Sequence, residues 1–138
     1  MGGLRQFCET YERTSVARFN GLMVCYNIEM RQLSDGTFSG TGYKSWEVLS
    51  GTDGRDLSPS EQSPIRVTGS VNNSDTITMQ YTVQGARRAT TGTATFDGGR
   101  TVLYSTVGGD SEDFPGTFRS TAANASGAAR ISAYALRD

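Results

Sequence analysis

Hydrophobic and polar residues alternate along most of this chain, which is the pattern of β-strands with one buried face. The clearest example is 21–33, where one face carries Leu22, Val24, Tyr26, Ile28 and Met30. Further strand-like stretches follow, separated by turns such as Asp35-Gly36, a strong hairpin signal. The predicted strands are 21–33, 37–49, 65–71, 76–83, 87–96, 101–107, 116–121 and 128–136.

The first 20 residues carry a different pattern. Leu4, Phe7, Cys8 and Tyr11 are spaced like one face of a helix. We therefore expect a short N-terminal helix, most simply a plug over one end of the fold that follows.

Eight strands joined mostly by short turns predict an antiparallel meander in an all-β domain. Closing eight strands into an up-and-down barrel removes both exposed sheet edges, and a two-sheet sandwich is the alternative. The 138 residues fit a single domain, 1–138, with the helical extension in 1–20 and the barrel in 21–137. The longest irregular segment, 49–64, is expected at the barrel mouth.

The net charge and the cysteine content limit the possible binding partners and the cellular compartment of the protein. The net charge of −1 gives no positive electrostatic field that would attract a nucleic acid or an anionic membrane. No apolar run is long enough for a membrane helix, and the start lacks the apolar core of a signal peptide. We expect a cytoplasmic protein, or a secreted or periplasmic one if a signal peptide has been removed. Cys8 and Cys25 are expected as free thiols, with one bond possible, and Cys25 could serve a homodimer contact.

The chain contains no histidine, which removes the usual partner of a catalytic serine or cysteine. No cluster has metal-ligand spacing, and the acidic stretch 110–114 reads as a solvated loop. The sequence therefore predicts no metal and no cofactor.

The layout of 21–137 resembles the calycin superfamily of lipocalin, fatty-acid-binding and avidin barrels. The lipocalin Gly-x-Trp motif is replaced here by "RFNGLMVCY", and one tryptophan stands where avidins have several, so retinoid, fatty-acid and biotin ligands do not carry over. The chain also looks like small eight-stranded barrels that act as cyclases in bacterial natural-product pathways. Both resemblances imply a lumen for a small hydrophobic molecule.

Alternation places a set of candidate ligand-binding side chains in that lumen: Tyr26, Lys44, Trp46, Met79, Tyr81, Arg88 and Tyr104. Lys44 is the only lysine and shares a face with Trp46, the only tryptophan, if the strand is regular. Under the same assumption Glu47 faces away and cannot be the partner of Lys44. Lys44 could instead be a rim charge and Trp46 a core filler. Arg87 could replace Arg88 if the register differs.

Three functions are compatible with this pattern. The leading one is binding of a small hydrophobic molecule in the lumen. The alternative is a cofactor-free cyclase or isomerase, with Lys44 and Tyr81 as catalytic groups. The third is an interaction module with a filled core, acting through 49–64 and 108–114. The sequence does not decide whether the protein is an enzyme.

Overall fold

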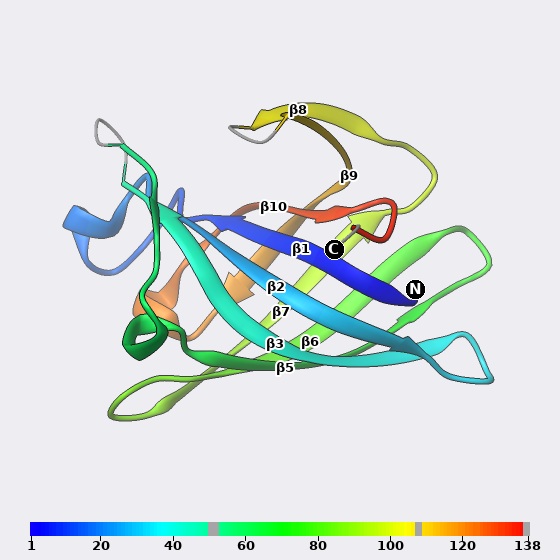
Figure 1. Cartoon of the computed structure of the whole chain (residues 1–138), viewed down its shortest axis with the longest axis horizontal. Helices are drawn as coiled ribbons and strands as arrows, with labels where there is room; N and C mark the ends of the chain where they lie inside the picture. The colour runs from blue at the N-terminus through cyan, green and yellow to red at the C-terminus, as the bar shows by residue number, and fades with distance from the viewer. Residues whose placement is uncertain (50–52, 107–108, 137–138) are drawn as a thin grey trace.

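The computed structural model describes residues 1–49, 53–106 and 109–136, whose strands form a closed, antiparallel, eight-stranded barrel (Figure 1). The barrel order is β1-β2-β3-β5-β6-β7-β9-β10, and β10 returns to pair with β1. The strands are β1 (Gly3–Thr10), β2 (Met23–Gln32), β3 (Thr37–Val48), β4 (Arg55–Asp56), β5 (Pro64–Val71), β6 (Thr76–Gln84), β7 (Ala89–Asp97), β8 (Val102–Thr106), β9 (Gly109–Ser120) and β10 (Ser126–Ser132). The 3-10 turns are η1 (Ala17–Phe19), η2 (Pro59–Glu61) and η3 (Ala122–Asn124).

The expected N-terminal helix is wrong. Residues 3–10 form β1, which pairs with β2 on one side and β10 on the other and so closes the barrel. A strand in this position satisfies its backbone groups on both edges, which outweighs the helical spacing of the apolar residues. Between residues 1 and 20 the helical structure is limited to the three-residue turn η1.

The barrel also excludes one predicted strand. The stretch expected at 101–107 forms β8, which pairs with the first half of β9 and lies at the end of the sheet path, outside the closed ring. The acidic segment expected as a loop is that first half of β9. Residue 107 and residues 50–52 of the expected mouth loop lie outside the described residues. The prediction of eight barrel strands is confirmed in number, but the eighth strand of the ring is β1, between β10 and β2, and not β8.

The β8–β9 arm is fixed to the barrel by a buried ion pair. The Arg130 guanidinium donates to the Asp113 carboxylate over 2.8 Å, and the Ser111 hydroxyl donates to its second oxygen over 2.6 Å. Asp113 is buried, and the arginine lies over the Tyr104 ring with 4.3 Å to the ring centre. Tyr104 therefore packs on the arm instead of entering the lumen.

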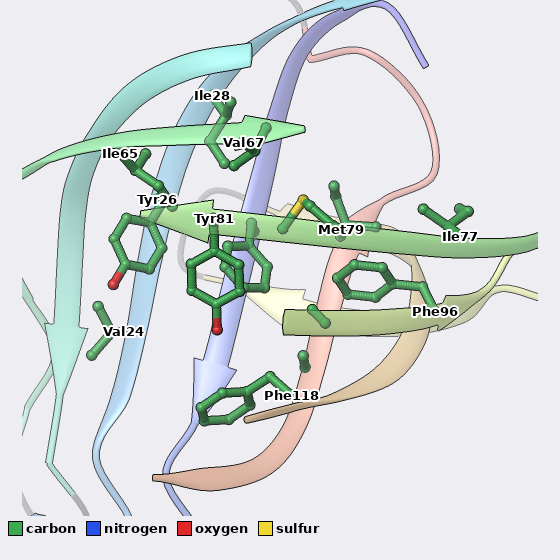
Figure 2. Close-up of a cluster of buried hydrophobic side chains, with 14 of the residues drawn as sticks. Val24, Tyr26, Ile28, Ile65, Val67, Ile77, Met79, Tyr81, Phe96 and Phe118 are labelled. Atoms are coloured by element: carbon green, nitrogen blue, oxygen red, sulfur yellow. The ribbon is translucent and has the colours of Figure 1, made fainter. Parts of the chain in front are cut away.

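Side chains fill the middle of the barrel. Phe7, Ile28 and Met79 are 0 % exposed, so no space the size of a water molecule adjoins them. The Phe7 ring lies 5.1 Å from Tyr81, 5.6 Å from Tyr26 and 6.0 Å from Phe96, measured between ring centres. Figure 2 shows Tyr26, Tyr81 and Phe96 within this cluster of buried side chains.

A β-bulge changes which side chains of β3 point inward. Cys25 pairs with Trp46, but Tyr26 pairs with Lys44, so Ser45 is an extra residue in β3. Lys44 therefore lies on the inner face with Tyr26, and Trp46 lies on the outer face with Cys25. The predicted common face of Lys44 and Trp46 is wrong, because it assumed a regular strand.

Cys8 and Cys25 form a disulfide, contrary to the free thiols that we expected. They are direct partners across β1 and β2, and both are buried. Cys25 is thus not a free thiol for a homodimer contact. Among the described residues, no helix is long and apolar enough to cross a membrane.

Candidate functional site

A carboxyl group lies inside the barrel near one end. Glu9 follows Phe7 by two residues on β1, so both side chains face inward, and Glu9 is 1 % exposed. Its partner in β2 is Val24, whose own partner in β3 is Glu47. These three residues therefore share one level of the inner face, at the end where β1 and β3 finish.

Two tyrosines lie beside this carboxyl group. The Tyr81 hydroxyl donates a hydrogen bond to Glu9 Oε2, and the Tyr26 side chain lies close enough to the same carboxyl group to interact with it electrostatically. Figure 2 shows both hydroxyl groups pointing toward the same end of the barrel. The register explains the Tyr81 position, because Tyr81 faces Gly92 on β7, where a Cβ atom would lie 2.2 Å from the tyrosine ring. Glycine at 92 thus leaves room for the ring.

Burial changes the acid–base properties of the cluster. Desolvation raises the pKa of Glu9 from 4.5 to about 7, although the hydrogen bond from Tyr81, the neighbouring Tyr26 side chain and the positive charge of Lys44 oppose the rise. Desolvation and the nearby Glu9 charge also raise the pKa values of Tyr26 and Tyr81. Near neutral pH both tyrosines are therefore hydrogen-bond donors, and Glu9 exists in both protonation states.

A chain of charges connects this cluster to solvent. Lys44 Nζ lies 3.7 Å from a Glu47 oxygen, and the two side chains are 26 % and 23 % exposed. Arg55 on β4 donates to Glu47 over 2.6 Å and to Glu61 over 2.8 Å. Hydrogen bonds from Arg55 are the main cause that lowers the pKa of Glu61 to about 2. The half-buried pair of Lys44 and Glu47 thus lies between the buried carboxyl group of Glu9 and the exposed strand β4, which carries Arg55.

The structure brings some predicted site residues together and separates others. Tyr26, Met79 and Tyr81 are interior, and Lys44 lies at the edge of the Glu9 cluster. The remaining three are elsewhere: Trp46 on the outer face, Arg88 exposed in the turn before β7, and Tyr104 on the β8–β9 arm.

Sequence reasoning missed Glu9 and Glu47. Glu9 was hidden because a helix was expected there, and the face of residues 5, 7, 9 and 11 mixes charged and aromatic side chains, so it gives no clear strand alternation. Glu47 was excluded as the partner of Lys44 because the bulge at Ser45 was not foreseen. The bulge leaves no sequence signal that we can identify.

The described residues contain no group of three or more histidine, cysteine, aspartate or glutamate side chains arranged to hold a metal ion. The chain matches no protein-family model, no curated protein and no solved structure. The resemblance to calycins therefore rests on the closed eight-stranded barrel itself.

Proposed function

We propose that the Glu9 end of the barrel binds the polar end of a small, mostly apolar molecule. The observation that carries the proposal is a carboxyl group that is 1 % exposed and hydrogen-bonded to Tyr81 inside the barrel, with Tyr26 beside it. Burying an ionisable group costs free energy that an apolar side chain would not cost. Such groups in barrel interiors are candidates for functional sites.

The chemistry of the cluster defines the ligand class. Protonated Glu9 can donate a hydrogen bond to a carbonyl oxygen, and ionised Glu9 can accept one from a hydroxyl group. Apolar residues surround the carboxyl group, including Val24 and the Tyr11 and Phe118 rings, whose centres are 5.7 Å apart. A ligand with one carbonyl or hydroxyl group and an apolar body fits these surroundings.

The ligand must open its own space at this end of the barrel, since the middle is filled and Glu9 is 1 % exposed. The pair formed by Lys44 and Glu47 is half-buried and separated by 3.7 Å, which is long for an ion pair. A partly exposed pair of this kind contributes about 1 kcal/mol or less. A ligand can therefore displace it at small cost and reach the Glu9 cluster from this side.

The test is calorimetric titration with a panel of apolar alcohols, ketones and carboxylates. We expect saturable binding by the native protein and at least about tenfold weaker binding by Glu9→Gln, equivalent to about 1.4 kcal/mol. Glu29→Gln removes the same charge from the exposed outer face and serves as the matched control. Binding that is unchanged in Glu9→Gln, or absent across the panel in the native protein, would contradict the proposal.

A cofactor-free cyclase or isomerase is the second candidate, favoured by the Glu9 pKa of about 7. A group with this pKa can take and return a proton near neutral pH. Glu9 would transfer the proton, while Tyr26 and Tyr81 would polarise a substrate carbonyl. Product analysis of the binding mixtures separates the two functions. An enzyme should lose turnover in Tyr81→Phe while the variant stays folded, and full turnover would exclude this role for Tyr81.

The disulfide gives an argument about the cellular compartment of the protein. Disulfides persist in oxidising compartments and are rare in the cytosol. The bond between Cys8 and Cys25 therefore favours the secreted or periplasmic alternative over the cytoplasmic expectation. Thiol labelling of the denatured, unreduced protein recovered from its native compartment should modify neither cysteine, and labelling of both would restore the cytoplasmic prediction.

A further inference from the structure

A groove of about 1050 Å³ crosses the outer face of the barrel, on the side chains that point away from the lumen. It extends over β2, β3, β5, β6, β7 and β9. Its lining includes inward-facing residues such as Val67 and Tyr81 as well as outward-facing polar side chains. The groove is separate from the Glu9 cluster and has no part in the function proposed above.

Strand register arranges the polar side chains of the groove in a row. Partner positions across the six strands give one continuous sequence: Arg31, Ser39, Thr68, Gln80, Thr93 and Arg119. Five steps between neighbouring strands make this row about 24 Å long. Arginines thus lie at both ends, with hydroxyl and amide groups between them.

A second row strengthens the positive charge. Thr41, Arg66, Thr82 and Thr91 are partners on the next level, and Arg66 lies between the two end arginines. The residues lining the groove include three arginines and one carboxylate, Glu29. None of the ion pairs between described residues involves these arginines. The groove therefore concentrates unpaired positive charge on a protein whose net charge is −1.

We propose that this groove binds a linear acidic polysaccharide with carboxylates spaced along a hydroxyl-rich chain. Guanidinium groups bind carboxylates through two parallel hydrogen bonds, which suits Arg31, Arg66 and Arg119. The serine, threonine and glutamine side chains between them can donate to and accept from sugar hydroxyls. The length of the row requires an extended ligand.

Charge density and composition separate this ligand from a nucleic acid. A single nucleic-acid strand carries a phosphate about every 3.4 Å, whereas the groove offers three arginines along about 24 Å. Single-strand binding also uses aromatic side chains for base stacking. The one aromatic residue among those lining the groove is Tyr81, whose ring lies inside the barrel.

Affinity electrophoresis in gels containing hyaluronate tests the proposal, because carboxylated and neutral sugars alternate in this polymer. Neutral dextran and a single-stranded oligothymidine serve as comparison ligands. The variant is the double change Arg31→Gln with Arg119→Gln. The control is the double change Arg88→Gln with Arg100→Gln, which removes an equal charge from the exposed turns at the two ends of β7, outside the groove.

We expect hyaluronate to retard the native protein, added salt to weaken the retardation, and dextran to have no effect. The Arg31→Gln, Arg119→Gln variant should bind at least about tenfold more weakly, and the Arg88→Gln, Arg100→Gln control and Glu9→Gln should stay within about twofold of the native protein. The proposal is overturned if hyaluronate causes no retardation, if the Arg31→Gln, Arg119→Gln variant binds like the native protein, or if dextran binds equally well. Tighter binding of oligothymidine through the same two arginines would also overturn it, in favour of a nucleic acid.

Discussion

Replacing Glu9 by glutamine should change how the stability of the barrel depends on pH. Glutamine has nearly the same shape, and its carbonyl oxygen can accept the hydrogen bond from Tyr81, so the packing around Phe7 is preserved. The change removes the one buried carboxyl group that the structure assigns a pKa of about 7. Comparison of native protein and variant therefore isolates the cost of ionising Glu9 inside the barrel.

The sign follows from the two pKa values. Below about pH 4.5, Glu9 is protonated in both the folded and the unfolded chain, and its full contribution to stability is present. As pH rises toward 7, Glu9 ionises first in the unfolded chain, which favours unfolding. Above about pH 7 Glu9 ionises in the folded chain too, and the stability of the fold decreases no further. The interval from 4.5 to about 7, at about 1.4 kcal/mol per pKa unit, corresponds to a loss of about 3 kcal/mol.

Urea unfolding followed by Trp46 fluorescence, from about pH 4.5 to about pH 8.5, measures this loss. Few other groups interfere, because the chain has no histidine. The N-terminal ammonium group, whose pKa is lowered from 8.0, titrates in both proteins and cancels in the difference. We expect the variant to gain stability relative to the native protein by about 3 kcal/mol between the ends of this range, and Glu29→Gln to gain none. A native-minus-variant difference that stays flat with pH would refute the reasoning.

Three further changes test other parts of the fold, each by urea unfolding. Replacing Cys8 and Cys25 together by alanine removes a cross-link between residues 17 apart and should cost about 3 kcal/mol; a loss below about 1 kcal/mol would mean that the bond does not restrain the unfolded chain. Asp113→Asn leaves the buried Arg130 charge without its carboxylate partner and should cost about 3–5 kcal/mol, whereas an unchanged midpoint would show that the pair does not fix the arm. Gly92→Ala places a methyl group against the tyrosine ring of β6 and should cost about 1–3 kcal/mol, so full stability would mean that the ring can move aside freely.

Alternation predicted the strands that have one apolar face and one polar face. β2, β5 and β6 lie where the sequence placed them, since apolar residues such as Ile65 and Ile77 recur at every second position along them. β1 could not be identified in this way, because its inner face carries Glu9 and its outer face carries Cys8. The buried carboxyl group and the disulfide thus obscured the apolar pattern of the strand that holds them.

Side-chain direction was less predictable than strand position. One extra residue, Ser45, reverses the facing of every later side chain of β3, which moved Trp46 outward and Glu47 inward. Strand membership in the barrel was also hidden, because the sequence of β8 indicates a strand just as the sequences of the barrel strands do. Whether a strand joins the ring or extends an arm depends on its long-range partners, and these are not encoded in its own pattern.

Barrel closure has a consequence for synthesis. The closing ladder pairs Phe7 of β1 with Ile131 of β10, so β1 cannot complete its pairing until the last barrel strand has been synthesised. Until then the outer edge of β1 is unpaired and the interior carboxyl group of Glu9 remains hydrated. Ring formation with such distant partners is slow, in the range of milliseconds to seconds for β-rich domains. The ring cannot close before β10 has been synthesised, whereas joining Cys8 and Cys25, direct partners on the first hairpin, requires only β1 and β2.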